Sequence, residues 1–226
     1  MTLRFSKKLI VFSLCLNLLV TIPALVLFFM SSSIQYTLYQ NVLAPRFGSA
    51  RIAFIGDSIT RYGDIWGPKI GEYNFNVWNF GHVGYTTRQM HSYLSEVLKQ
   101  KPDIAFVMAG INDPDKSITG AYQSFKNYRF ILDSLINTGT EPVIQLTLYR
   151  KREKHPDFID ELNRLLVLYA RQNNLTVIDL NPFLSREKSL LEKYSLDGIH
   201  LTAAAYEVWS KEIKQVLNQK EILEKQ

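Results

Sequence analysis

The sequence is poor in cysteine and lacks acidic residues in its first part. Its one cysteine, Cys15, has no partner within the chain, which excludes an intramolecular disulfide framework. Residues 1–50 contain four basic and no acidic side chains, whereas the remaining residues contain 22 basic and 21 acidic ones. Most of the net charge of +5 therefore lies in the N-terminal segment. No basic stripe interleaved with aromatic residues is present, so nucleic acid is not an expected partner.

The N-terminal segment contains an uncharged, largely apolar run of 22 residues, 9–30. A helix that crosses about 30 Å of hydrocarbon needs roughly 20 such residues. Basic side chains lie in residues 1–8 and none follows the run for 15 residues. The positive-inside rule then predicts a cytoplasmic N-terminus, a transmembrane signal-anchor at 9–30, a spacer at 31–50 and a domain on the non-cytoplasmic side, periplasmic or extracellular. A cleaved signal peptide, which would secrete the protein, and a buried helix of a soluble core are the alternatives.

From residue 51 onward, short apolar runs alternate with helical patterns. The apolar runs predict strands buried on both faces, at 52–55, 76–80, 104–109, 143–148 and 176–180. The intervening patterns predict helices at 59–70, 87–100, 122–137, 158–173 and 203–217, the last with Thr202 as its N-cap. This order predicts one α/β domain, residues 51–217, with a five-stranded parallel sheet and helices on both faces. Residues 218–226 form a C-terminal tail.

The side chains with catalytic potential follow the strands, at the carboxyl edge where such sheets collect functional groups. Ser58 comes after the first strand, and Asp197 and His200 come before the last helix. Serine becomes an effective nucleophile when a histidine takes its proton and a carboxylate fixes the tautomer of that histidine. Taken singly, a Ser58 helix cap and an Asp197 turn are ordinary structural explanations. Together, the three residues predict nucleophilic catalysis.

Acyl transfer also needs hydrogen-bond donors for the oxyanion of the tetrahedral intermediate. The backbone N–H groups of Ser58 and Gly81 and the side-chain amide of Asn112 are the candidates, because each follows a predicted strand. Glycine permits close approach of the backbone to a ligand. The alternative roles are turn formation by Gly81 and an Asx turn at Asn112.

Four sequence blocks resemble those of the SGNH, or GDSL-type, hydrolases. They are Gly-Asp-Ser-Ile at 56–59, Asn-Phe-Gly-His-Val-Gly at 79–84, Gly-Ile-Asn-Asp at 110–113 and Asp-Gly-Ile-His at 197–200. The resemblance implies a three-layer α/β/α, flavodoxin-like fold and serine ester hydrolysis without a metal or another cofactor. It implies that Ser58 is the nucleophile, His200 the base and Asp197 the orienting carboxylate. It also implies an oxyanion hole formed by Ser58, Gly81 and Asn112.

A basic segment follows the fourth strand. Arg150, Lys151 and Arg152 are either a solvated loop or a basic lip that binds an anionic substrate or lipid headgroups. The leading functional prediction is a membrane-tethered esterase that removes a short acyl group, such as acetyl, from a glycan, a lipid or a small molecule. An O-acyltransferase acting on a polysaccharide uses the same residues, and a catalytically silent glycan-binding protein on the same fold is the alternative from another class. The substrate and the oligomeric state do not follow from the sequence.

Overall fold

The fold is a single parallel sheet covered by helices on both faces. The computed structural model describes Thr21, residues 52–71 and residues 76–220. The sheet has the strand order β2-β1-β3-β4-β5, which is the flavodoxin-like order. Its strands are β1 (Ile52–Gly56), β2 (Val77–Gly81), β3 (Ile104–Met108), β4 (Glu141–Gln145) and β5 (Thr176–Ile178). All strand pairs within it are parallel. The predicted five-stranded parallel sheet is therefore confirmed.

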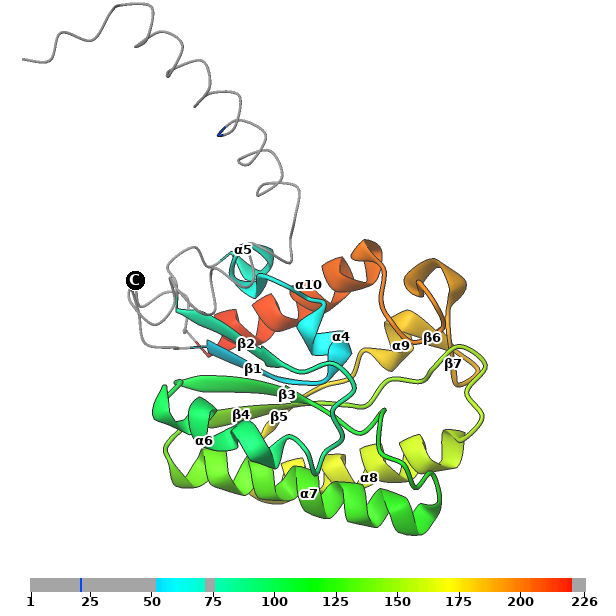
Figure 1. Ribbon diagram of the computed structural model, residues 1–226, viewed down its shortest axis with the longest axis horizontal. Coiled ribbons are helices and arrows are strands. Elements are labelled where there is room, and N and C mark those ends of the chain that lie inside the picture. The colour runs from blue at the N-terminus through cyan, green and yellow to red at the C-terminus, as the bar shows by residue number, and fades with distance from the viewer. Residues whose placement is uncertain (1–20, 22–51, 72–75, 221–226) are drawn as a thin grey trace, which may run out of the picture.

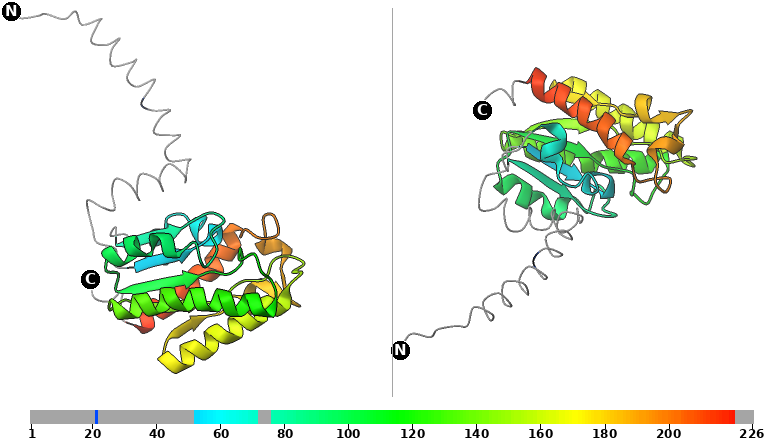
Figure 2. Two further views of the ribbon diagram at one scale, coloured as in Figure 1. Left: turned by 60° about the horizontal axis from the view of Figure 1, so that its bottom comes forward. Right: turned by 90° about the horizontal axis from the view of Figure 1, so that it is seen from above.

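The helices form the two outer layers. They are α4 (Ser58–Arg61), α5 (Trp66–Ile70), α6 (His91–Lys99), α7 (Ile118–Asn137), α8 (Pro156–Asn173), α9 (Asn181–Leu184), the 3-10 helix η2 (Glu192–Tyr194) and α10 (Ala203–Gln219). In Figure 1, α6, α7 and α8 lie below the sheet, and α4, α5 and α10 lie above it. Figure 2 shows the same layers from two other directions. Within the described ranges, no helix combines the length and apolarity needed to cross a bilayer. The predicted anchor at 9–30 lies outside these ranges, apart from Thr21.

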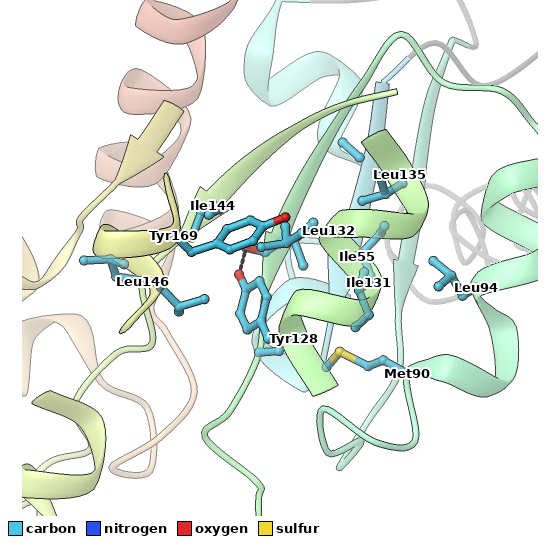
Figure 3. Packing of buried hydrophobic residues seen from close by; sticks show 14 of the residues in the cluster. Ile55, Met90, Leu94, Tyr128, Ile131, Leu132, Leu135, Ile144, Leu146 and Tyr169 are labelled. Atoms are coloured by element: carbon cyan, nitrogen blue, oxygen red, sulfur yellow. Dashed lines mark hydrogen bonds between the residues drawn. The ribbon is translucent and has the colours of Figure 1, made fainter. Parts of the chain in front are cut away.

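Alternation along the strands divides the core into two clusters. Ala53 and Ile55 of β1 belong to the cluster under α6, α7 and α8, whereas Ile52 and Phe54 belong to the cluster under α5 and α10. Figure 3 shows part of the first cluster, including the α7 side chain Leu132. Because successive residues of a strand point to opposite faces, a central strand must be apolar throughout. All five residues of β1 are buried for this reason.

Aromatic packing holds the α5 and α10 layer on the sheet. The indole of Trp66 stacks on Phe54 at a ring-centroid distance of 4.4 Å and meets Trp209 edge-on at 4.7 Å. Trp66 and Trp209 are at most 1% exposed. Burial of a large apolar side chain contributes about 1.5–3 kcal/mol, and an aromatic pair adds about 0.5–1.5 kcal/mol. The two tryptophans therefore fix the layer that ends beside the loop 195–201.

The predicted helix at 59–70 is wrong, because this segment contains two short helices, α4 and α5. Asp64 between them has φ = 60°, which breaks helical geometry. Side chains satisfy the carbonyl groups left open by the break: Trp66 Nε1 donates to Thr60 O at 3.2 Å, and Asn79 Nδ2 donates to Thr60 O at 3.1 Å and to Asp64 O at 3.0 Å. The segment therefore turns sharply over the end of β2 instead of extending along the sheet.

Other boundaries also differ from the sequence predictions. Helix α6 begins at His91 and not at 87, because Thr87 donates to Asp113 through its N–H and its hydroxyl. Helix α7 begins four residues earlier than predicted, at Ile118, since Ser117 caps it. Thr202 occupies the N-cap position of α10, but its hydroxyl donates to Lys193 O and caps nothing. The hairpin β6 (Ser185–Arg186) and β7 (Ser189–Leu190) was not predicted.

Candidate active site

The first strand delivers Ser58 to the carboxyl edge of the sheet through a tight turn. A Cβ on Gly56 would lie 2.1 Å from Thr60 Oγ1 and 2.7 Å from the Met108 carbonyl oxygen, so only glycine allows this close packing. Asp57 caps α4, and its Oδ1 accepts the N–H of Ile59 at 2.9 Å. Ser58 is then the first residue of α4 and is 4% exposed. The turn therefore fixes the position of Ser58 at this edge of the sheet.

The structure brings Ser58, His200 and Asp197 together although 142 residues separate the serine from the histidine. His200 Nε2 lies 3.0 Å from Ser58 Oγ, and His200 Nδ1 lies 2.6 Å from Asp197 Oδ2. These distances match the nucleophile–base and base–carboxylate hydrogen bonds of a catalytic triad. The sequence prediction paired these same three side chains.

Asp197 is held in its ionised form by local hydrogen bonds. Its Oδ1 accepts the N–H groups of His200 at 2.8 Å and Ile199 at 3.0 Å. These bonds, with the bond from the His200 ring, lower the pKa of Asp197 to about 2. An ionised carboxylate can only accept, so the hydrogen-bond network assigns the ring proton to Nδ1 and leaves Nε2 as the acceptor for Ser58. His200 is thus oriented as a general base.

The loop that carries Asp197 is fastened to the segment after β4. Lys151 N donates to Gly198 O at 2.8 Å, and Ser195 Oγ accepts the N–H of Gly198 at 2.6 Å. Gly198 has φ = 99°, a conformation that favours glycine. The ring of Tyr62 meets the imidazole of His200 edge-on at 5.0 Å. The loop that carries His200 is therefore supported from within by Ser195 and from two other segments by Lys151 and Tyr62.

The three candidate oxyanion donors differ in availability. The N–H of Ser58 is at the first position of α4 and has no acceptor among the described residues. The N–H of Gly81 donates to Asn79 Oδ1 at 2.9 Å, so its use in an oxyanion hole requires that bond to be shared or exchanged. Asn112 Nδ2 donates one hydrogen to Tyr85 O at 3.3 Å and keeps a second one. The roles of Gly81 and Asn112 stay predictions.

Two buried aspartates, Asp113 and Asp57, lie next to the site residues Asn112 and Ser58. Asp113 is 4% exposed and accepts from Thr87 N at 2.7 Å and Thr87 Oγ1 at 2.6 Å, which holds the loop that carries Asn112. Asp57 is 1% exposed, and burial raises its pKa to about 7. Its Oδ2 has no hydrogen-bond partner within the described part of the chain. The carboxyl group next to the nucleophile is therefore protonated over much of the range below neutral pH.

The predicted basic lip is only partly free to meet a substrate. The guanidinium of Arg150 donates to the carbonyl oxygen of Ile111, and Lys151 pairs with Glu192. Arg152 is exposed, and no partner of its guanidinium is seen among the described residues. The segment lines a cavity of about 290 Å³ that it shares with residues 197–199. Substrate contact by Arg150, Lys151 and Arg152 stays a prediction, and the structure gives Arg150 an internal contact.

Several side chains near the triad were not found from the sequence. They are Tyr62, which contacts His200, Asn79, which joins β2 to α4, and Lys116, which donates to the carbonyl groups of the Asn112 loop. A cavity of about 610 Å³ begins at Tyr62 and continues along α10. Tyr62 lies one helical turn after Ser58, a spacing that places both on one side of a helix. Asn79 opens the sequence block at 79–84, but its contact with α4 arises from the tertiary fold, and no comparable pattern marks Lys116.

Known proteins share this fold and part of this sequence. A curated N-acylneuraminate cytidylyltransferase from Streptococcus agalactiae serotype III is 30% identical over 135 residues, which cover 58% of this chain and 32% of that protein. The chain thus spans about a third of the length of the curated relatives it matches. A lipase/acylhydrolase from Enterococcus faecalis superposes with a TM-score of 0.62 and 22% identity, covering 76% of this chain and 96% of that one. An acetyl xylan esterase superposes with a TM-score of 0.63 and 17% identity, covering 74% and 98%.

The family of this chain follows from a match to a family model that covers most of the domain. Residues 54–208 match the GDSL-like lipase/acylhydrolase family, and this range contains Ser58, Asp197 and His200. It also contains all five strands of the sheet except the first two residues of β1. The chain belongs to the GDSL-like lipase/acylhydrolase family.

Proposed function

We propose that the protein is a serine esterase that hydrolyses a short-chain ester, such as an acetyl ester, of a glycan, a lipid or a small molecule. The observation that carries this proposal is the continuous hydrogen-bonded chain from Ser58 Oγ through His200 to Asp197. A binding protein on this fold would need none of these three side chains at such distances. Family membership supports the same reaction class.

The geometry supports a two-step reaction through an acyl-enzyme. Ser58 Oγ attacks the ester carbonyl carbon while His200 Nε2 takes the hydroxyl proton. Backbone N–H donors and the Asn112 amide stabilise the oxyanion, each contributing about 2.7–4 kcal/mol. The intermediate collapses as His200 protonates the leaving alcohol. Water then attacks the acyl-enzyme, His200 takes a proton from it, and the acid leaves as Ser58 regains its proton.

Carbohydrate esters are the substrate class that the relatives favour. One relative is an N-acylneuraminate cytidylyltransferase, and one structural neighbour is an acetyl xylan esterase. The cavity of about 610 Å³ beside Tyr62 falls within the usual size range for a small-molecule site. Exposed Tyr62 lines this cavity and contacts the ring of His200. We infer that the alcohol part of the substrate occupies this side of the triad.

The location of the reaction is a separate proposal, which the sequence alone supports. The uncharged run at 9–30 and the basic residues before it favour an anchored protein whose domain lies on the non-cytoplasmic side. A short ester on a cell-surface glycan or lipid would then be within reach of the domain. Cleavage of the segment would give a secreted enzyme with the same site.

Hydrolysis of p-nitrophenyl acetate by wild type, Ser58→Ala and Asp197→Asn tests the function. Ser58→Ala should lower kcat by about 10⁴-fold or more, and Asp197→Asn by about 10⁴-fold, because the latter keeps the turn but stabilises the wrong tautomer of His200. Asp157→Asn, on the exposed start of α8, is the matched control and should equal wild type. Equal turnover by Ser58→Ala would refute the serine mechanism. A folded wild type without turnover would direct the assay to a glycan acceptor, as for an acyltransferase.

A further inference from the structure

Two cations from distant parts of the chain converge on one backbone carbonyl group in the active-site loop. Lys116 Nζ donates to the carbonyl oxygen of Ile111 at 2.8 Å and to that of Gly110 at 3.2 Å. The Arg150 guanidinium, 39 residues from Ile111 along the chain, donates to the same Ile111 oxygen. Ile111 is 3% exposed, so this meeting point is inside the protein. We call Lys116, Arg150 and the Ile111 carbonyl the Ile111 clamp.

The clamp is an unusual place for two positive charges. Within the described ranges, neither cation has a carboxylate at ion-pair distance, and the ammonium of Lys116 instead lies 4.4 Å from the ring centroid of Phe158. Like charges brought together in a partly buried site repel one another. Charge-assisted donation to a carbonyl is stronger than donation by a neutral group. The two cations therefore lack a carboxylate partner among the described residues and instead hold one peptide group, that of the Ile111 carbonyl, in place.

That peptide group controls the position of Asn112. The Ile111 carbonyl and the Asn112 N–H belong to one planar peptide unit, so fixing the oxygen fixes the Asn112 backbone. On its other side, the Asn112 amide is held by Tyr85 O at 3.3 Å. We propose that Lys116 and Arg150 are positioning residues that place the Asn112 amide for the oxyanion. This inference rests on the proposed esterase function and extends it to the regulation of the site by pH.

The protonation state of Lys116 makes the clamp sensitive to pH. Burial and the positive charge of Arg150 lower the pKa of Lys116 to about 8, while Asp113, Glu153 and Asp57 oppose the shift. Below this pH the ammonium donates strongly, and above it the neutral amine donates weakly. Arginine remains charged across this range. Activity should therefore fall as the pH rises through about 8.

The kinetic test compares Lys116→Arg, Lys116→Met and Asn112→Ala with wild type on p-nitrophenyl acetate. Lys116→Met should lower kcat about 10-fold with little change in KM, because a misplaced donor affects the transition state most. Asn112→Ala should lower kcat about 100-fold. The double variant Lys116→Met/Asn112→Ala should lose no more than Asn112→Ala alone, since both changes act on one group. Lys126→Met, on the exposed face of α7, is the matched control.

The pH dependence of kcat separates a positioning role of Lys116 from a merely structural one, because a structural role would not change it. Near neutral pH, Lys116→Arg should keep the wild-type kcat, in contrast to Lys116→Met. It should also abolish the decline in kcat above about pH 8, because arginine keeps its charge. In parallel, NMR of the Asn112 side-chain amide should show a transition with a midpoint near about pH 8 in wild type and none in Lys116→Arg. The NMR arm needs no turnover, and Lys116→Arg keeps a cation in place if Lys116→Met does not fold.

The outcomes separate the clamp from the esterase proposal. Multiplicative losses in the double variant, or an unchanged alkaline decline in Lys116→Arg, would overturn the clamp while leaving the esterase intact. An inactive wild type whose Asn112 amide still follows the Lys116 titration would overturn the esterase and keep the clamp. An Asn112 signal that is insensitive to pH in wild type would also refute the clamp.

Discussion

At the scale of single residues, Asp57 lies next to Ser58, and the folded protein disfavours the ionisation of its carboxyl group. Its pKa rises from 3.8 to about 7 because burial removes the carboxylate from water. At a pH between these two pKa values, Asp57 is ionised in the unfolded chain and protonated in the folded protein. The free energy of unfolding should therefore fall as the pH rises from about 4 to about 7, by an amount on the order of 4 kcal/mol. Below about pH 4 this contribution is fully present.

Asp57→Asn measures that contribution directly. The amide oxygen of the substituted side chain can still accept the Ile59 N–H, so the cap of α4 is preserved while the titration is removed. Urea unfolding at about pH 4, 6 and 8 should show a much flatter pH dependence in the variant, which should exceed wild type in stability at the highest of these values. Asp157→Asn should keep the wild-type profile. Parallel profiles for Asp57→Asn and wild type would contradict the prediction.

The grouping of Ser58, Asp197 and His200 was predictable because local sequence determines their immediate surroundings. Gly56 permits the turn, Asp57 caps the helix and Asp197 binds its own backbone two and three residues on, all within short segments. The contacts of Asn79 were not predictable, because the folded chain brings its acceptors on α4 and the loop after it near. Lys116 bonds to carbonyl groups five and six residues before it, in a loop whose conformation no periodic pattern predicts. Arg150 was placed correctly at the active edge, but its guanidinium reaches inward to Ile111.

At the scale of elements, β1, β2 and β3 were predicted to within one residue at each end, because burial on both faces leaves a continuous apolar run. The predictions at 143–148 and 176–180 were less accurate, since β4 ends at Gln145 and β5 at Ile178, and the apolar residues that follow them are buried without belonging to the sheet. The helices were predicted less well where side chains outside the helix decide its ends, as Asp113 does for α6. The β6–β7 hairpin escaped prediction for a different reason. Its turn places Glu187 at φ = 49° and Lys188 at φ = 58°, although such turns usually carry asparagine and glycine. A contact between Lys188 and Asp160 helps to hold this turn.

The segment after β4 is the element whose role in specificity is open to direct test. Arg152→Gln should raise KM about fivefold for an anionic ester, because one exposed charge pair contributes about 1 kcal/mol. Lys151→Gln as a second change should add less, since Lys151 already pairs with Glu192. KM for a neutral ester should stay unchanged, and the effect should shrink in high salt. Lys99→Gln, at the far end of α6, serves as the control. Equal effects on KM for the neutral and anionic esters would show that the segment does not recognise the negative charge of the substrate.

At the scale of the whole molecule, the charge is concentrated ahead of the domain and not on it. Residues 51–226 are nearly neutral, and the excess of basic side chains lies in the first 50 residues. A nearly neutral domain gives little long-range attraction to anionic surfaces. The apolar run at 9–30 is therefore the predicted source of a stable association with a membrane. That run was recognised from composition alone, and the described fold adds nothing to it.

Two arginines inside the run test the predicted anchor. Leu19→Arg/Val20→Arg places two charges near its centre, at about 2.5–3.5 kcal/mol each, and should move the protein from the membrane pellet to the soluble fraction. Thr2→Arg/Ser6→Arg adds the same charge on the predicted cytoplasmic side and should leave the protein in the pellet. Mass measurement of the wild type decides between an anchor and a cleaved signal, since cleavage removes the run. A full-length wild type in the soluble fraction would refute both, because residues 9–30 would then be neither inserted nor removed.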